Sequence, residues 1–447
     1  MPAAPPLAFL PPRFDRRVLA LSRLLLPIGL RTVADIRELK VTGGDRLVSS
    51  MASFEAGESR LLLAFRHPSI SDPLCLASLL WRELPRQDRQ QGRRLRGIPH
   101  SFFLYDRGIP LWAGAPLGWL LQRLGGTSIQ RGKLDTAALR SARALLLDGS
   151  FPFAAAPEGA TNGHNELVSP LEPGIAQLAF WTAEDLARSE RAERMIILPI
   201  GLQYSWCEPI WGGIDGLLCD MERNAGLSPP TAGRLDPDLL YGRLLVLAER
   251  MLELLEQFYR RAYQRDLPEL SGLVPRLERL LTTALEVVEE SLGVRSAGSL
   301  DERCRRLEQA AWERLYPPAG EDESRCQLQR GLADRLADET EGRLWHMRMV
   351  ESFTAVSGSY VRERPSQERF ADTLLLLWDT QCRLLGTNPA RRPRLGPRRA
   401  QITMGAPIAV EERLAEYRKN RRQAVAALTS DLQRSLEGLI SPSELPG

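Results

Sequence analysis

A histidine and an aspartate in the first quarter of the chain have the spacing of a general base and its orienting acid. The segment H-P-S-I-S-D places His67 five positions before Asp72 and shortly after the apolar residues 61–65. A buried strand over 61–65 would deliver the imidazole to the edge of a sheet. Asp72 could then hold one ring nitrogen while the other takes a proton from a substrate. A histidine beside a carboxylate is also common as a satisfied polar contact, so the pair alone leaves both interpretations open.

Covalent catalysis by a serine is the alternative chemistry within the same motif. Ser69 and Ser71 both lie between His67 and Asp72. The sequence contains no G-x-S-x-G segment, the turn that exposes the nucleophilic serine of many hydrolases. We therefore expect the hydroxyl that His67 activates to belong to the substrate.

Three further segments follow in order and combine glycine, charged residues and apolar runs. They are G-T-S-I-Q-R at 126–131, P-E-G-A-T at 157–161 and I-L-P-I at 197–200. With the H-x4-D motif, this series resembles the four sequence blocks of the glycerolipid acyltransferase superfamily, the lysophosphatidate acyltransferase-like proteins. The resemblance extends over residues 50–205 and, more weakly, over a short C-terminal segment.

The resemblance implies a reaction and a set of site residues. A fatty acyl group would move from acyl-CoA or acyl-ACP (acyl-carrier protein) to the hydroxyl of a lysophospholipid, most specifically 1-acyl-glycerol-3-phosphate, in phospholipid biosynthesis. His67 and Asp72 would be catalytic. Substrate would contact Arg131, Gly126, Glu158, Gly159, Thr161 and Pro199. The resemblance implies no metal or cofactor, because the acyl carrier is a co-substrate.

The identity of the acceptor is the open part of this interpretation. Arg131 is the expected phosphate contact, because a planar guanidinium offers two parallel charged hydrogen bonds. The third block departs from the family pattern: Ala160 stands where threonine is usual, and Thr161 and Asn162 take the places in which an arginine commonly follows. His164 could substitute for that missing charge or have a structural role. Glycerol-3-phosphate or another lysolipid is the alternative acceptor, and a non-catalytic lipid-binding or scaffold protein is the alternative of another class.

Composition narrows the remaining possibilities. The 447 residues are 43% hydrophobic and 26% charged, enough for a large core, and the formal net charge of +3 gives no indication of nucleic-acid binding. The six cysteines form no C-x-x-C pair, which argues against a zinc or redox motif and predicts reduced thiols. No apolar run reaches the roughly 18 residues of a membrane-spanning helix. We therefore expect a cytoplasmic protein that associates peripherally with a membrane surface.

Three stretches are candidates for that membrane contact. Residues 18–28 are apolar and flanked by arginine, and they could lie on the core or on a membrane interface. Residues 111–119 mix leucine, tryptophan, glycine and proline, a pattern typical of either a lipid-facing loop or ordinary packing. Residues 391–399 combine arginines with prolines, as expected for a solvated linker or for contact with an anionic surface.

Hydrophobic periodicity predicts the fold of the first half of the chain. Residues 1–32 form an N-terminal amphipathic segment. Residues 33–214 alternate apolar strands, such as 151–156 and 195–200, with helical stretches such as 136–147. This alternation predicts an α/β fold with a mixed sheet and flanking helices, which the resemblance identifies as the acyltransferase catalytic core.

The second half is predicted to be helical except at its end. Residues 215–395 contain apolar residues at three- and four-residue steps, for example over 236–264, and S-L-D-E at 299–302 is a capping box that begins a further helix. Residues 396–447 predict a strand with the segment G-A-P-I, followed by a helix, as at the end of the acyltransferase family. We therefore expect a large all-helical subdomain inserted into the catalytic domain. A separate C-terminal domain is the alternative.

Overall fold

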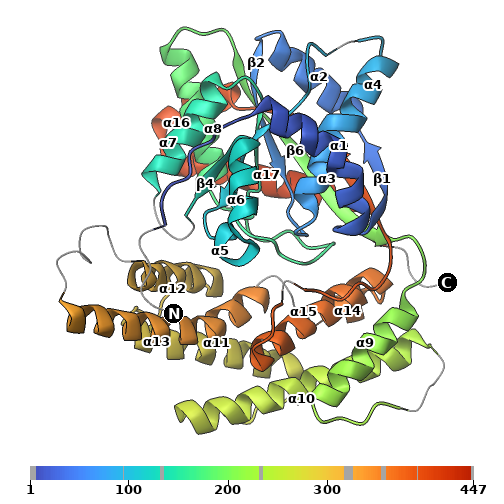
Figure 1. Ribbon diagram of the computed structural model, residues 1–447, viewed down its shortest axis with the longest axis vertical. Coiled ribbons are helices and arrows are strands. Elements are labelled where there is room, and N and C mark those ends of the chain that lie inside the picture. Colours follow the sequence, from blue (N-terminus) through green and yellow to red (C-terminus); the bar gives the residue numbers. More distant parts are fainter. Residues whose placement is uncertain are drawn as a thin grey trace.

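An eight-stranded sheet forms the centre of the first region of the molecule (Figure 1). The structure is a computed structural model and describes residues 7–93, 95–130, 135–230, 235–316, 326–353, 359–389 and 391–443. The strands across the sheet are β1 (Ile36–Thr42), β7 (Arg398–Met404), β6 (Arg194–Trp206), β2 (Ser59–Phe65), β5 (Phe153–Ala155), β3 (Phe102–Asp106) and β4 (Gly126–Ile129), and β8 (Ile408–Ala409) pairs with β6.

The sheet is mixed but mostly parallel. The strands from β6 to β4 run parallel to one another, whereas β7 is antiparallel to β6 and parallel to β1. Helices cover both faces, so strand β2 is apolar throughout its interior. Leu61 and Leu63 face one core and Leu62 and Ala64 face the other, as the two-residue period of a strand requires. The predicted α/β fold with a mixed sheet and flanking helices is confirmed.

Two sets of helices make these faces. One face is covered by α1 (Arg16–Thr32), α2 (Gly44–Glu55), α3 (Asp72–Ser78), the π-helical turn η1 (Leu79–Glu83) and α4 (Leu84–Gln90). The other is covered by α7 (Thr136–Asp148), α8 (Gly174–Arg188), α16 (Leu414–Lys419) and α17 (Arg421–Glu437). The short helices α5 (Ile109–Ala113) and α6 (Ala115–Arg123) connect β3 to β4, and the 3-10 turn η2 (Glu411–Arg413) precedes α16.

The chain leaves the sheet after β6, forms a run of helices and returns as β7. We call residues 211–385 the helical segment; its elements are α9 (Trp211–Asn224), α10 (Pro237–Tyr263), α11 (Leu273–Leu292), α12 (Leu300–Leu315), α13 (Gln327–Phe353), α14 (Tyr360–Glu363) and α15 (Gln367–Leu385). In Figure 1 this segment lies beyond one edge of the sheet region. The predicted capping box is present at α12, where Ser299 and Glu302 each accept a hydrogen bond from the other's backbone N–H.

Two elements differ from their predicted bounds. Strand β6 continues past Ile200 to Trp206 because its second half pairs antiparallel with β7. The C-terminal helix is divided at Asn420, whose extended backbone ends α16 and whose side chain caps the start of α17. Among the described residues, no helix has both the length and the hydropathy needed to cross a membrane.

Candidate active site

The carboxyl ends of β2 and β5 bring the first and third sequence blocks together. Leu62 to Ala64 pair in register with Phe153 to Ala155, so the loops that follow leave the sheet at the same edge. The backbone N–H of His67 donates to Glu158 Oε1 over 2.7 Å, and the backbone N–H of Asn162 donates to the His67 carbonyl over 3.2 Å. The two loops are therefore fixed to each other at His67.

His67 and Asp72 form the pair that their spacing predicts. His67 Nδ1 lies 2.8 Å from Asp72 Oδ2, and the backbone N–H of Ser69 donates to the same oxygen over 3.0 Å. Asp72 is the first residue of α3 and is fully buried. Because the carboxylate accepts, Nδ1 is assigned the proton and Nε2 the lone pair. This is the tautomer that a general base requires.

Tyr204 holds the other oxygen of Asp72 and was missed at the sequence level. Its hydroxyl donates to Asp72 Oδ1, and Cys75 Sγ lies 3.4 Å from the same hydroxyl. Burial, and then the charge of Asp72, raises the pKa of Tyr204 well above its usual value, so the hydroxyl keeps its proton. The available signal was the alternation of Leu198, Ile200 and Leu202 on one face of β6, which continues to Tyr204.

Thr161 places a hydroxyl at the free nitrogen of the imidazole. Thr161 Oγ1 lies 3.0 Å from His67 Nε2, and the His67 side chain is 21% exposed. The turn that carries Thr161 depends on Gly159, which has φ +74° and where a Cβ would lie 2.6 Å from Glu172 Oε1. The site thus aligns a carboxylate, an imidazole and a hydroxyl that solvent can reach.

The two serines of the motif are directed elsewhere. The Ser69 hydroxyl oxygen accepts a hydrogen bond from the backbone N–H of Ser71 over 3.2 Å. The Ser71 hydroxyl oxygen accepts from Arg398 Nη2 over 3.0 Å. The hydroxyl beside the imidazole therefore comes from the third block rather than from the first.

Glu158 is an organising residue in this arrangement. Its Oε1 accepts from His67, while its Oε2 accepts from Asn162 Nδ2 over 2.7 Å and from the Ser169 backbone N–H over 2.9 Å. The side chain is buried, and that burial raises the pKa of the carboxyl. Both oxygens are thus committed within the protein. The predicted contact between Glu158 and substrate stays a prediction.

Arg66 holds the loop that contains residues 164–167, and the sequence did not predict this role. Its side chain is fully buried directly before His67, and burial lowers the pKa of the guanidinium. It donates only to backbone carbonyls, those of Leu202, His164, Leu167 and Asn165. Because four carbonyls converge on one side chain, Arg66 sets the path of the loop that carries the third block.

The remaining predicted site residues have other positions. Gly126 begins β4, where a Cβ would meet the Phe103 ring at 2.7 Å, so packing accounts for the glycine. Pro199 lies in the middle of β6, in register with Ala64. Both residues lie within the sheet rather than in the loops beyond it. Arg131 lies outside the described residues. Substrate contact by these three residues stays a prediction.

The other three histidines are buried. Burial lowers the pKa of His100 to about 4 and those of His164 and His346 to about 3, so these rings are neutral near pH 7. His164 therefore does not replace the positive charge that the third block lacks. Arg392 comes closer to that role, because its guanidinium lies 3.4 Å from where a Cβ on Gly163 would be.

The arginines of residues 391–399 are largely engaged within the protein. Arg392 pairs with Asp379 of α15, and Arg394 donates to the Thr32 carbonyl. Arg398 donates to the Ala34 carbonyl over 2.7 Å and lies over the Tyr204 ring, and Arg399 pairs with Glu38. This stretch thus anchors the return of the chain into β7 beside the site.

Comparisons with known proteins leave the family open. No protein-family model matches the chain, and neither the curated proteins nor the solved structures contain a match. Within the described ranges, no group of three or more His, Cys, Asp or Glu side chains could hold a metal ion.

Proposed function

We propose that the chain is an acyltransferase. It transfers a fatty acyl group from acyl-CoA or acyl-ACP to the hydroxyl of a lysophospholipid, with 1-acyl-glycerol-3-phosphate as the first choice, in phospholipid biosynthesis. The proposal depends chiefly on the Asp72–His67 pair, in which a buried carboxylate holds Nδ1 and a hydroxyl faces Nε2 at 3.0 Å. An alcohol is a poor nucleophile near neutral pH, and this pair supplies the base that it needs.

The proposed reaction assigns a step to each group of the site. The acceptor hydroxyl takes the place of the Thr161 hydroxyl at His67 Nε2. Nε2 removes its proton as the oxygen bonds to the thioester carbonyl carbon, and Asp72 stabilises the imidazolium. The imidazolium returns the proton to the sulfur as the carbon–sulfur bond breaks. Tyr204 and the Ser69 N–H keep Asp72 in position throughout.

Two positive charges support an anionic acceptor. Arg131 has this role in the family that the sequence resembles. Arg392, whose guanidinium lies beside Gly163 and also pairs with Asp379, is the second candidate. Either could form charged hydrogen bonds to a phosphate.

The surface near the site supports delivery of the acceptor from a membrane. Helix α1 buries Leu19, Leu26 and Leu30 and exposes Leu21, Leu24, Leu25 and Ile28 on its other side. It packs on α3, the helix that begins at Asp72, and Ile70 between His67 and Asp72 is also exposed. Exposed apolar side chains on α1 and in the loop between His67 and Asp72 suit an enzyme that works at the membrane interface.

An acyl-transfer assay on the purified full chain tests the proposal. Radiolabelled palmitoyl-CoA and palmitoyl-ACP are each offered with 1-acyl-glycerol-3-phosphate, glycerol-3-phosphate and lysophosphatidylcholine. We expect labelled phosphatidate as the main product, and none with His67→Ala. Transfer to another acceptor would correct the substrate. Absence of transfer to every acceptor from both donors would favour the lipid-binding alternative.

Thr161 gives a second candidate function, a lipid esterase. Its hydroxyl lies where a nucleophile activated by His67 would lie. The Thr161 oxygen would attack an ester carbonyl and release the alcohol, and water would then cleave the acyl-threonine. Thr161→Ala separates the two functions: a transferase keeps its rate within about tenfold, whereas an esterase loses at least roughly a thousandfold. A mass increase on Thr161 after a brief exposure to substrate would support the esterase.

A further inference from the structure

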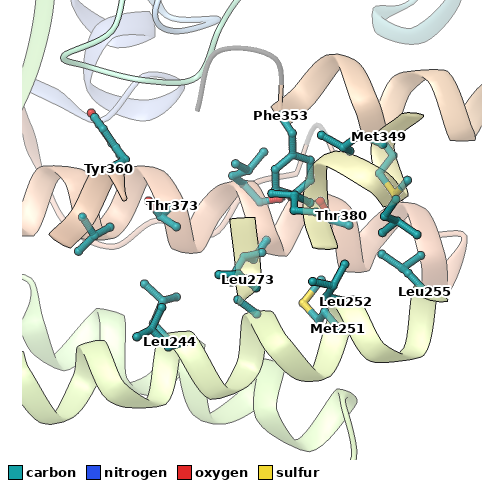
Figure 2. Close-up of a pocket in the computed structure, with 18 of the residues that line it drawn as sticks. Leu244, Met251, Leu252, Leu255, Leu273, Met349, Phe353, Tyr360, Thr373 and Thr380 are labelled. Carbon is teal, nitrogen blue, oxygen red and sulfur yellow. Dashed lines mark hydrogen bonds between the residues drawn. The ribbon is translucent and has the colours of Figure 1, made fainter. Parts of the chain in front are cut away.

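An apolar cavity lies within the helical segment (Figure 2), and His67 is not among the residues that line it. It is lined by residues of α10, α11, α13, α14 and α15, and Leu244, Met251 and Leu252 extend into it from α10. Its volume is about 90 Å³, several times the roughly 10–15 Å³ that one water molecule needs on a comparable measure. Protein interiors rarely leave such a space unfilled.

Three hydroxyls that line the cavity already have hydrogen-bond partners within the protein. The hydroxyls of Thr373 and Thr380 each donate over 3.0 Å to a carbonyl of their own helix. The Tyr360 hydroxyl donates over 3.1 Å to Asp372, and Figure 2 shows it turned away from α10. No charged side chain is among the described residues that line the cavity. The walls therefore offer apolar contacts and few hydrogen bonds, which suits hydrocarbon better than water.

Access and adaptability favour a flexible chain as the occupant. Several lining residues are half-buried rather than buried, among them Leu245 and Ala248 of α10 and Leu277 of α11, so the cavity reaches the surface. Met251 and Met349 add flexible thioether side chains that adjust to different occupants. A ligand with a polar head could leave that head at the surface and bury only its tail.

One wall of the cavity also contacts the loop that follows the third block, at His164 and Asn165. Tyr360 lines the cavity, and its ring lies 5.6 Å from that of His164. Asp372, which accepts from Tyr360, also accepts from the Asn165 backbone N–H over 2.9 Å. An occupant that moves Tyr360 would therefore act directly on the loop that carries Thr161.

We propose that this cavity binds a long hydrocarbon chain, the tail of a fatty acid or of a fatty acyl ester, with the polar head at the surface. The inference goes beyond the proposed reaction and does not depend on it. A lipid-binding protein without catalytic activity would use the cavity in the same way.

Binding of cis-parinaric acid, a fluorescent 18-carbon fatty acid, to the full chain provides the test. We expect saturable binding that palmitic acid reverses and hexanoic acid does not. Ala248→Trp fills the cavity and should weaken binding at least about tenfold, the effect of excluding about two methylenes. Leu254→Trp, on the exposed side of the same helix, is the matched control and should bind as the wild type does. Equal loss in both variants, or no saturable binding by the wild type, would overturn the proposal.

A second measurement avoids dependence on substitutions. Palmitic acid with a photoreactive diazirine near its methyl end should crosslink to peptides of α10, α11 or α15. Crosslinks confined to the exposed face of α1 would overturn the proposal. Competition then identifies the natural ligand. If palmitoyl-CoA displaces the probe at lower concentration than palmitic acid does, the ligand is the acyl donor. The reverse order indicates a free fatty acid. His67→Ala should bind the probe normally, so this result and the transfer assay fail independently.

Discussion

His67 in the sheet region and His346 in the helical segment differ in their environment rather than in their number of hydrogen bonds. Both rings have partners at both nitrogens: Asp72 and Thr161 for His67, and the Tyr259 and Tyr263 hydroxyls, at 2.5 and 3.0 Å, for His346. His67 has a carboxylate partner and is 21% exposed. His346 is fully buried between phenols, and burial lowers its pKa to about 3. A histidine with hydrogen-bond partners at both ring nitrogens is therefore not by itself a candidate base. A charged partner and access to solvent distinguish His67 from His346.

The two regions also differ in how they use their interiors. At the carboxyl ends of the strands, the buried polar groups Asp72, Glu158 and Arg66 are each hydrogen-bonded to the backbone of the site loops. The helical segment instead keeps a cavity of about 90 Å³ lined by apolar side chains. The side chains that line such a cavity lack contact atoms on one side, which favours a cavity with an occupant.

The largest expected difference between the two histidines is in catalysis by His67. His67→Ala should lower the kcat of acyl transfer at least about a hundredfold, because the proton of the acceptor hydroxyl then lacks a base. The free energy of unfolding should change little, since the ring is partly exposed and lies at the edge of the core. Steady-state kinetics and urea denaturation on the same preparation measure both quantities. Near wild-type turnover would remove His67 from the mechanism.

His346→Ala should give the opposite result. Truncation removes a buried ring and leaves the Tyr259 and Tyr263 hydroxyls without their partner, so we expect a loss of about 2–4 kcal/mol in the free energy of unfolding. The rate per folded molecule should stay near that of the wild type. His346→Gln, which keeps a polar group in place, should recover part of the loss. A variant of normal stability that lacks activity would show that His346 has a functional role.

The sequence predicted those parts of the site that depend on local pattern. The apolar run before His67 and the spacing to Asp72 were sufficient to predict a strand, a loop and a pair in contact. Tyr204 was missed because the predicted strand ended at Ile200, next to Gly201, although the alternation of apolar residues continues to Tyr204. Its contact with Asp72 joins residues 132 positions apart, which no local periodicity can reveal.

The same limit applies to the other unpredicted features. Strand β1 carries exposed charged residues and depends for its position on β7, with which it pairs. Arg66 resembled an ordinary charged residue after a strand, yet it is fully buried and donates to four backbone carbonyls, three in the loop and one in β6. The roles of Gly126 and Glu158 likewise depend on neighbours distant in sequence. Residue type and spacing located the candidate base, whereas tertiary contacts determine what holds it.

Asp372 joins the two regions and should make stability depend on pH. Burial raises the pKa of its carboxyl to about 7, above the usual value near 4. Between these values the folded state binds a proton that the unfolded state has released, so the free energy of unfolding should fall as pH rises through this window. The slope contributed by Asp372 should be on the order of 1 kcal/mol per pH unit.

The matched control for this prediction is Asp372→Asn, which cannot titrate. Its free energy of unfolding, measured by urea denaturation between pH 4.5 and 7.5, should lack the contribution that falls with pH in the wild type. Parallel pH profiles for the two proteins would contradict the prediction. They would mean that Asp372 is ionised throughout and is held by Asn165 and Tyr360 alone.

The smallest expected effect is on membrane binding, when exposed leucines of the two regions are replaced. Leu24 on α1, the helix that packs on α3, is 73% exposed, and Leu328 on α13 of the helical segment is 80% exposed. If the sheet region faces the membrane, Leu24→Ala should weaken binding to phosphatidylglycerol vesicles about fivefold, because partial burial of one leucine is worth about 1 kcal/mol. Leu328→Ala should leave binding unchanged.

Vesicle flotation at low and high salt also measures the charge contribution, which salt screens. Equal weakening by both variants would mean that the helical segment contacts the bilayer too, and flotation of neither variant nor the wild type would mean that the acceptor arrives in soluble form.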